Sequence, residues 1–457
     1  MSTIYANRAR LPDGWVRGLR LTVEGGTIAA LATDAVPEAG DVRVDTLLPA
    51  LGNLHSHAFQ RAMAGMTEVR AEGRDSFWTW RDLMYRFLDR LTPEQTEAIA
   101  ALAFMEMQEA GFAAVGEFHY VHHRPGGAPY ADPAELSKRI FAAAAATGIG
   151  LTHLPVLYTY GAAGRAPLAG GQLRFGNDVT GFQSLVAAVR DGIGTLPPDA
   201  RVGIAPHSLR ATAPADLKEV LAAHAAGGGG PVHVHAAEQP KEVADVEAWL
   251  GSRPVQWLLD EAGAGAGWCL IHATHMTAAE TVALARSGAV AGLCPITEAN
   301  LGDGPFNGPG YLAAGGAFGV GSDSNVRVSL VEELRTLEYS QRLRDLARNV
   351  LRVGEGSVGA ALYLGAAQGG ARALGRDSGA IAQGRLADLV AIDGTAPALC
   401  ALDGDRLLDG LVFASGDGAV TDLWSAGRHA VQGGRHAARN RIVRDYRAAM
   451  ASLLASL

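Results

Sequence analysis

Eight short apolar runs recur along the middle of the chain, and each is long enough to form a buried β-strand. Between most of them lie Ala- and Leu-rich segments of helical length, such as residues 93–111 and 329–347. Strands that alternate with helices predict an α/β fold with a parallel (β/α)₈ barrel of the TIM type. The expected barrel strands are residues 47–53, 113–118, 151–157, 201–205, 231–236, 268–273, 289–294 and 317–323.

The two ends of the chain have a different pattern, in which short alternating runs are separated by glycine. The segment GLRLTVEGGTIAALAT predicts a β-hairpin with Gly25-Gly26 at the turn. The segment VTDLWSAGRHAVQGGRH predicts a second hairpin that turns at or near Gly427-Arg428. Two β-rich ends on either side of a long α/β middle predict one small β-sandwich domain built from both termini.

These patterns also set the expected domain boundaries. The 457 residues are enough for more than one domain. We expect residues 1–48 and 376–457 to form the N- and C-terminal parts of the β-sandwich, and residues 49–375 to form the barrel.

Composition and charge argue against several classes of protein. Hydrophobic residues make up 48% of the chain and charged residues 19%, as in ordinary globular enzymes. The formal net charge of −8 argues against a general nucleic-acid binder. Cys269, Cys294 and Cys400 are far apart and form no Cys-x-x-Cys pair, which argues against thiolate metal ligands. No signal peptide and no apolar run of roughly 18 residues is found, so we expect a cytoplasmic protein.

Polar side chains follow several of the expected strands and predict a metal site. His55 and His57 lie two residues apart after the first strand, a spacing that places both imidazoles on one face of an extended chain. In the fifth strand His233 and His235 compete as ligands, and we assign His235 because it lies closer to the strand's C-terminal end. Glu238 follows three residues later, and we assign it to proton transfer, which a hydrolytic site needs beside its metal.

Two further strand ends complete the expected site. His272 ends the sixth strand, with His275 as a nearby alternative, and Asp323 ends the eighth. An aspartate in this place can ligate a cation and can also accept a proton. Because catalytic groups of such barrels gather at the C-terminal ends of the strands, these residues should meet at one mouth. Three imidazoles and one carboxylate suit Zn²⁺ or a similar divalent ion, and together they favour a metal-dependent hydrolase.

The order of these motifs resembles the amidohydrolase superfamily, in its mononuclear deaminase branch, over essentially the whole chain. The HxH pair, the His-x-x-Glu motif, the later histidine and the Ser-Asp-Ser sequence carry the resemblance. A binuclear member would usually need a bridging lysine in the fourth strand, and the segment RVGIAPHSLR has none, which favours a single metal. The resemblance implies one Zn²⁺ held by His55, His57, His235 and Asp323, with acid/base roles for Glu238, His272 and Asp323.

Within that superfamily the chain most resembles the formimidoylglutamate deiminases of histidine degradation, through LHSHAFQRAMAG, SFWTWRDLMYR, GEFHYVHH and APHSLRA. This resemblance implies hydrolysis of N-formimidoyl-L-glutamate to N-formyl-L-glutamate and ammonia. Arginine is the natural bidentate partner of a carboxylate, so Arg81 and Arg210 suit the two carboxylates of a glutamate derivative. The residues implied in substrate binding are Gln60, Arg81, Tyr120, His207 and Arg210.

Two other functions stay open at this point. The first is another mononuclear deaminase acting on a purine, a triazine or an adenosine derivative, which would need an aromatic-lined pocket without paired arginines. The second is a non-enzymatic barrel, which could dispense with the metal ligands. As partners we expect a small anionic substrate, no nucleic acid and no membrane, and we expect a homodimer.

Overall fold

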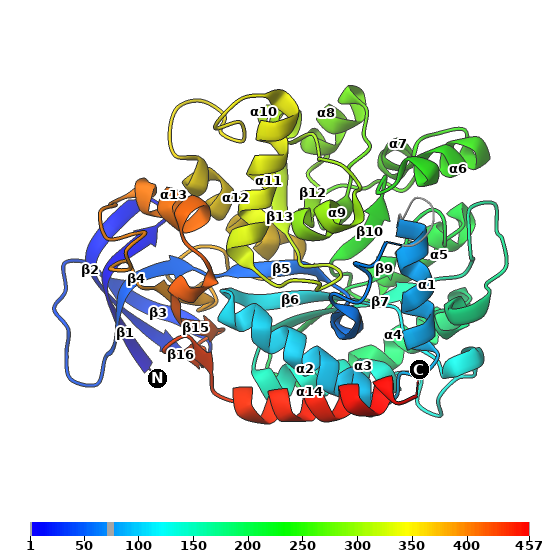
Figure 1. The fold of residues 1–457 in the computed structure, drawn as a ribbon, viewed down its shortest axis with the longest axis horizontal. Coiled ribbons are helices and arrows are strands. Elements are labelled where there is room, and N and C mark those ends of the chain that lie inside the picture. Colours follow the sequence, from blue (N-terminus) through cyan, green and yellow to red (C-terminus); the bar gives the residue numbers. More distant parts are fainter. Residues whose placement is uncertain (1, 71–76, 457) are drawn as a thin grey trace.

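The computed structural model describes residues 2–70 and 77–456, and its strands form a terminal sheet and a barrel (Figure 1). The terminal sheet has eight strands in the order β17-β16-β15-β14-β4-β1-β2-β3. β4 pairs in parallel with β1 and antiparallel with β14, so it joins the N-terminal strands to the C-terminal ones. The strands are β1 (Ser2–Leu11), β2 (Gly14–Glu24), β3 (Thr27–Ala32), β4 (Val42–Pro49), β14 (Leu389–Ile392), β15 (Val420–Ser425), β16 (Arg428–Gln432) and β17 (Arg435–His436).

Both predicted hairpins are confirmed within this sheet. β2 and β3 pair up to Glu24 and Thr27, and the two turn glycines have φ of 58° and 87°, the left-handed region that a tight two-residue hairpin turn favours. β15 and β16 turn one residue earlier than predicted, at Ala426-Gly427. The sheet has a hydrophobic cluster of its own, to which strands from both chain ends contribute. The domain boundaries predicted at residues 48 and 376 stay predictions.

The barrel follows the predicted alternation of strands and helices. Two parallel sheets form it, β5-β6-β7-β8 with β9 beside β7, and β10-β11-β12-β13. Parallel bridges Ile204–Val232 and Ser56–Asp323 connect the two sheets and close the ring. The strands are β5 (Leu51–Ser56), β6 (Phe112–His119), β7 (Gly150–Leu157), β8 (Arg201–Val202), β9 (Ala205–Pro206), β10 (Val232–Ala236), β11 (Trp268–His272), β12 (Val290–Leu293) and β13 (Ala317–Val320).

The first predicted barrel strand, residues 47–53, was wrong in its boundaries. The extended chain breaks at Ala50, so residues 47–49 belong to β4 and pair with β14, whereas β5 begins at Leu51 and pairs with β6. The backbone amide of Ala50 donates to the Asp388 carbonyl at 3.0 Å, which fixes the crossing point. One apolar run therefore contributes a strand to each of two sheets. Its hydropathy pattern does not indicate where the pairing partner changes.

Helices surround the barrel, and local sequence signals explain where several of them begin. Thr92 and Gln95 form a capping box before α2, and Thr277 and Glu280 form another before α8. The helices around the barrel are α1 (Phe77–Leu88), α2 (Pro93–Glu109), α3 (Glu135–Thr147), α4 (Val179–Ile193), α5 (Pro214–Ala226), α6 (Pro240–Leu250), α7 (Pro254–Glu261), α8 (Ala278–Ser287), α9 (Pro295–Leu301), α10 (Gly308–Ala313), α11 (Leu330–Asp345) and α12 (Val358–Ala373). Among the described residues, no helix is both long and apolar enough to cross a bilayer.

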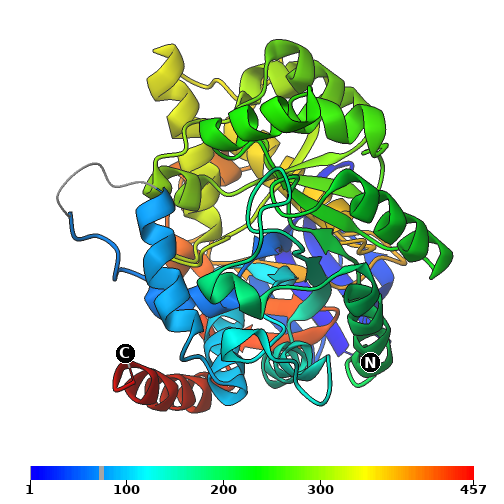
Figure 2. The same ribbon diagram turned by 90° about the vertical axis from the view of Figure 1, so that its right-hand side faces the viewer.

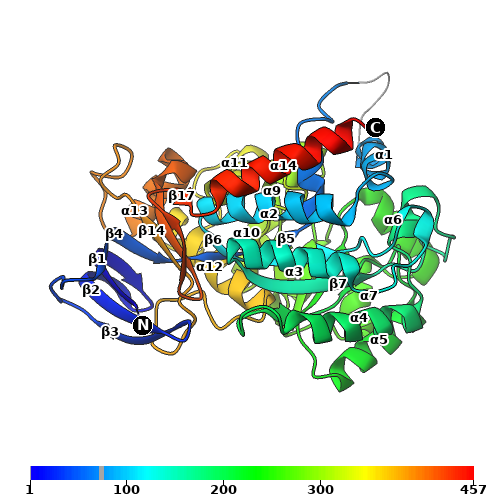
Figure 3. The same ribbon diagram turned by 90° about the horizontal axis from the view of Figure 1, so that it is seen from below.

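Two later helices follow the barrel, and the sequence analysis did not predict them. α13 (Asp405–Ala414) packs on α11 and α12, and α14 (Arg439–Leu454) lies along α2 (Figure 3). The last segment of the chain thus contacts a barrel helix rather than the terminal sheet. The short helix η1 (Ala58–Met63) follows the C-terminal end of β5. The C-terminal ends of the parallel barrel strands face the viewer in Figure 2.

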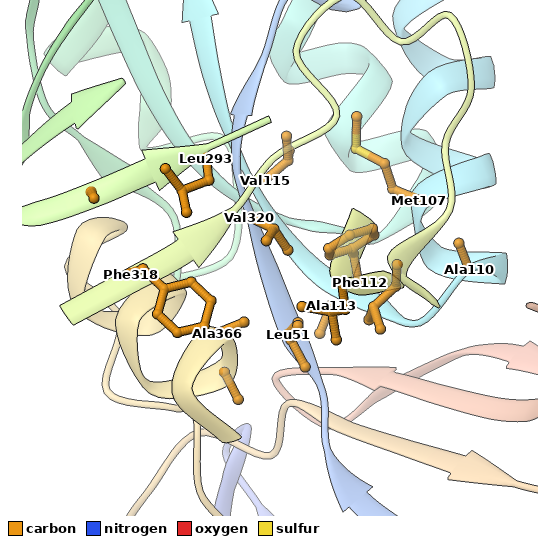
Figure 4. Packing of buried hydrophobic residues seen from close by; sticks show 14 of the residues in the cluster. Leu51, Met107, Ala110, Phe112, Ala113, Val115, Leu293, Phe318, Val320 and Ala366 are labelled. Carbon is orange, nitrogen blue, oxygen red and sulfur yellow. The ribbon is translucent and has the colours of Figure 1, made fainter. Parts of the chain in front are cut away.

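Close packing of α12 on the barrel holds the first and last strands together. Leu51, Phe112, Val320 and Phe318 meet in the hydrophobic core near this helix (Figure 4). A Cβ atom at Gly369 would lie 1.8 Å from the Phe318 carbonyl oxygen, so only glycine allows the helix to approach β13 this closely. This contact lies away from the C-terminal ends of the barrel strands. Those ends therefore remain open for polar side chains.

Candidate metal centre and catalytic pocket

Three histidines and an aspartate converge where β5, β10 and β13 end. His55 and His57 come from the end of β5, His235 from β10, and Asp323 from the turn after β13. The Nε2 atoms of His55 and His235 lie 3.1 Å apart. Asp323 Oδ1 lies 3.4 Å from His55 Nε2 and 3.3 Å from His57 Nε2. Ligands bound at about 2.0–2.1 Å to one cation are separated by about 3–3.5 Å, so these atoms fit a histidine-rich metal site.

The orientation and the charge state of the imidazoles suit this use. His57 Nδ1 lies 3.0 Å from the Phe118 carbonyl and His235 Nδ1 lies 3.1 Å from the His207 carbonyl. Donation by Nδ1–H leaves the lone pair of Nε2 directed at the cluster. Burial lowers the pKa of His55 to about 3, and burial with the neighbouring imidazoles lowers the pKa of His235. Both rings are therefore neutral, which is the form that binds a cation.

The backbone of the site is strained where it carries these groups. Five of the ten described non-glycine residues with positive φ lie here: Ala237, His272, Ala273, Asp323 and Asn325. Such conformations cost about 1–3 kcal/mol each and persist only where the surroundings impose them. At Asp323 the imposing contacts are its N–H to the His55 carbonyl and its own carbonyl to the His57 N–H, both 2.9 Å. The bonds that close the barrel thus also orient the carboxylate.

A network of buried polar side chains also connects the first barrel strand, β5, to the segment after the last one, β13. Asn53 Nδ2 donates to Ser322 Oγ at 2.6 Å, Ser322 Oγ donates to Asn325 Oδ1 at 2.6 Å, and Asn325 Nδ2 donates to Ser56 Oγ at 3.1 Å. All four side chains are fully buried. The first and third of these hydrogen bonds link β5 to the segment after β13, and the second lies within that segment, so the network fixes the position of the histidine pair relative to Asp323.

The proposed acid/base residues lie beside the cluster. His272 Nε2 is 3.8 Å from Glu238 Oε1 and 4.0 Å from Asp323 Oδ2, and its Nδ1 is 3.3 Å from Glu298 Oε1. Burial alone would lower the pKa of His272, but Glu238, Glu298 and Asp323 raise it to about 10. Burial raises the pKa of Glu238, while His272 and Arg210 oppose the rise. His272, Glu238, Glu298 and Asp323 thus form one buried cluster of side chains that can exchange protons.

One pocket brings the predicted metal, acid/base and substrate-binding residues together. Arg210 Nη2 lies 3.5 Å from Glu238 Oε2, and Gln60 Nε2 donates to Tyr120 Oη at 2.6 Å. The lining residues are His57, Gln60, Trp80, Arg81, Met84, Tyr85, Tyr120, Tyr158, Phe175, His207, Arg210, His235, Glu238, His272, Thr297, Leu301, Asp323 and Ser324. Of the predicted site residues, His55 lies beneath this surface, fully buried.

The structure also decides between the competing histidines. His233 lies on the same strand as His235, but its Nε2 is 2.8 Å from the Ala373 carbonyl at the end of α12, away from the pocket. His275 is half-buried and, unlike His272, does not line the pocket. Ser76, the first residue of the quoted aromatic motif, lies outside the described residues.

Sequence reasoning missed several residues of this pocket. Glu298 on α9 accepts the Cys294 N–H at 3.0 Å and faces His272, yet a glutamate inside a helical segment gives no separate signal. Tyr85 lies on the same helix as Arg81, whose guanidinium lies 5.5 Å from the centre of the tyrosine ring. Tyr158 directly follows β7, the kind of strand-end position that already singled out the other residues.

Comparisons with known proteins identify the family and the fold of this chain. The family model "Amidohydrolase family" matches residues 46–430, and "Formimidoylglutamate deiminase HutF, N-terminal domain" matches residues 1–45. The chain is 50% identical to formimidoylglutamate deiminase of Pseudomonas aeruginosa, over 99% of this chain and 100% of that protein. The crystal structure of an amidohydrolase from Brucella melitensis superposes with a TM-score of 0.95, at 47% identity, over 99% of this chain and 100% of that one. Atrazine chlorohydrolase of Arthrobacter aurescens, complexed with zinc, shares the fold with a TM-score of 0.83 at 20% identity, over 98% and 100% of the chains.

Proposed function

This chain belongs to the amidohydrolase family, and we propose that it hydrolyses N-formimidoyl-L-glutamate to N-formyl-L-glutamate and ammonia in histidine degradation. Full-length similarity to a formimidoylglutamate deiminase supports the proposal. The observation that carries it is the pocket itself, in which two arginines, Arg81 and Arg210, share one surface with the metal cluster and Glu238.

We assign one Zn²⁺ to the cluster, held by His55, His57, His235 and Asp323. The donor set of imidazoles and one carboxylate supports this assignment, and the separations His55–His235, His55–Asp323 and His57–Asp323, at 3.1, 3.4 and 3.3 Å, are near those of a first coordination sphere. When bound, such a cation supplies Lewis acidity, which polarises the reacting centre and makes the attacking water more acidic.

The chain's own groups then move the protons. Asp323 accepts a proton from the water that attacks the formimino carbon, and the protonated His272, whose pKa is raised to about 10, stabilises the charge that develops during the attack. Glu238 delivers a proton to the nitrogen, so the carbon–nitrogen bond breaks with ammonia as the leaving group and a formyl group remains. His272 lies within 4.0 Å of both carboxylates, so the three groups exchange protons as a coupled unit.

The remaining predicted residues hold the substrate. Arg81 and Arg210 bind its two carboxylates, while Gln60, Tyr120 and His207 line the same pocket and contact the rest of the substrate. The buried position of Arg210 supports this role, because a guanidinium that is shielded from water discriminates strongly for an anion. Aromatic side chains also line the pocket, which is the feature that a purine or triazine deaminase would need, but the paired arginines favour the acidic substrate.

Ammonia release from purified protein tests the proposal directly. N-Formimidoyl-L-glutamate should be turned over far faster than formimidoyl-L-aspartate, guanine or adenosine. Turnover of a purine with no activity on the formimidoyl amino acids would replace the proposed function by the ring-deaminase alternative. The homodimer and the cytoplasmic location stay predictions, and sedimentation analysis of the purified protein tests the first.

A further inference from the structure

Glu242, on the first turn of α6, is a fully buried carboxylate that the proposed reaction does not use. Its Oε1 accepts the Ala237 N–H at 3.1 Å and its Oε2 accepts the Glu238 N–H at 2.9 Å. We propose that Glu242 is a positioning residue that holds the backbone of Glu238, and thereby aims the Glu238 carboxylate at the reacting atoms. This inference rests on the proposed function, which assigns proton transfer to Glu238.

The turn that Glu242 holds needs an external support. Ala237 has a φ of 52°, a conformation that an alanine does not favour by itself. Its carbonyl accepts the His275 N–H at 2.9 Å, and the Ala236 carbonyl accepts the Ala273 N–H at 3.0 Å. The carbonyl groups of the turn are thus satisfied by the chain after β11, whereas the two N–H groups find their acceptor in Glu242. Without it, two buried donors would lose their partner, which favours a different turn.

The chemistry of the carboxylate suits the task better than any neutral group. Two N–H donors point at one side chain, and only a carboxylate offers two acceptor atoms without a competing donor. The start of α6 adds a partial positive charge that stabilises the buried anion. The Glu238 side chain that leaves this fixed backbone lies between Arg210, at 3.5 Å, and His272, at 3.8 Å. A displaced turn would therefore move Glu238 from both partners at once.

Glu242→Gln is the informative variant, because the amide keeps the size but opposes one N–H with its own donor. We expect kcat to fall roughly 10- to 100-fold, the scale of a misplaced catalytic group, with KM within about threefold and unchanged metal content. Glu247→Gln is the matched control, since Glu247 is exposed on the same helix. Glu242→Asp keeps the charge on a shorter arm and should lose less activity than Glu242→Gln.

A double-mutant cycle separates positioning from a general loss of structure. If Glu242 acts through Glu238, adding Glu242→Gln to Glu238→Gln should lower kcat no further, whereas independent effects would multiply. Multiplied losses would overturn the proposal. The same would follow from a Glu242→Gln kcat within twofold of wild type.

Amide hydrogen exchange gives a readout that needs no substrate. Glu242→Gln should speed exchange in the peptide covering residues 236–239 and leave β11 unchanged, and an unchanged 236–239 peptide would refute the proposed contact. If wild-type protein releases no ammonia from formimidoylglutamate, the proposed function fails, while the exchange experiment still decides whether Glu242 holds the turn. Should Glu242→Gln not fold, Glu242→Asp is used in the exchange experiment, where faster exchange of the 236–239 peptide supports the proposal and unchanged exchange refutes it.

Discussion

Replacing Arg210 by Met tests whether a buried charge selects the substrate. The Arg210 side chain is only 10% exposed, and Nη2 lies 3.5 Å from Glu238 Oε2 in the same pocket as Arg81. Burial disfavours the charge on Arg210, but Glu242 and Glu238 oppose this and raise its pKa, so the guanidinium stays positive. Met keeps an unbranched apolar stem and removes the guanidinium group, with its charge and its hydrogen-bond donors.

The expected size of the loss follows from the burial of this group. Removing one partner of a desolvated charge pair costs about 2–5 kcal/mol. Since 1.4 kcal/mol is a factor of ten, kcat/KM for formimidoylglutamate should fall at least roughly 30-fold and by more than about 10³-fold at the upper end. Metal content should not change, because Arg210 is not among the proposed ligands.

The same substitution should also shift the pH profile. Burial raises the pKa of Glu238, and Arg210 is one of the two groups that hold it down. Without that cation, the pKa of Glu238 rises further, and ionised Glu238 forms only at a higher pH. Because Glu238 must be protonated to deliver its proton, the basic limb of kcat/KM should move to higher pH in Arg210→Met.

Steady-state ammonia release on two substrates separates a carboxylate clamp from a folding defect. A neutral analogue with both carboxylates amidated should be poor for the wild type and should lose little further in Arg210→Met. Arg81→Met should behave like Arg210→Met, whereas Arg86→Met, at an exposed position on the same helix as Arg81, should match wild type. Equal losses on the charged and the neutral substrate would refute the clamp and favour a ring substrate.

Three further outcomes follow from the structure. Purified protein should hold about one Zn²⁺ per chain, and His235→Ala should lose metal and activity together; full metal in that variant, by elemental analysis, would remove His235 from the site. Glu238→Gln should retain metal and lose at least roughly 10²-fold in kcat, and a near wild-type rate would assign proton transfer elsewhere. Arg376→Met should lower the free energy of unfolding by about 3–5 kcal/mol, since it leaves the buried Asp388 carboxylate, 3.0 Å from the guanidinium, without its arginine and removes one of two arginine partners from Asp199, 3.2 Å away, which keeps Arg428. Burial raises the pKa of Asp199 but its arginine partners lower it overall, so this stabilisation is complete above the unfolded pKa of about 3.9 and is lost as pH falls through the lower folded value. Urea unfolding at pH 7 and pH 3 should show the deficit of Arg376→Met shrinking in acid.

Local patterns in the sequence were enough to identify the elements of this fold. Apolar runs predicted all barrel strands to within a few residues, because a parallel strand that is buried along its whole length, as β6 and β7 are, must be mostly apolar. Gly25-Gly26 marked its hairpin turn because the backbone there is left-handed. The chemical type of the residues at strand ends predicted a metal site, since imidazoles and carboxylates after successive strands of a barrel must meet at one end.

Long-range packing decided what the sequence alone could not. The apolar run over residues 47–53 divides between β4 and β5 at Ala50, although nothing in its hydropathy marks the change. Likewise, α14 packs along α2, a contact between segments more than 300 residues apart. Packing partners of this kind depend on which surfaces meet after folding, and a local sequence pattern does not encode them.

The supporting residues of the site show the same division most clearly. His235 and His233 are alike in sequence and share one face of a strand, but His235, nearer the C-terminal end, lines the pocket, whereas the ring of His233 contacts the Ala373 carbonyl. In the sequence, Glu242 and Glu298 look like ordinary helical glutamates. In the folded protein, Glu242 accepts from the backbone of Glu238, and Glu298 contacts the ring of His272. The sequence determined which chemical groups the protein owns and which strands carry them. Only the closed barrel, through hydrogen bonds between its first and last strands, decided which of those groups lie within reach of one another.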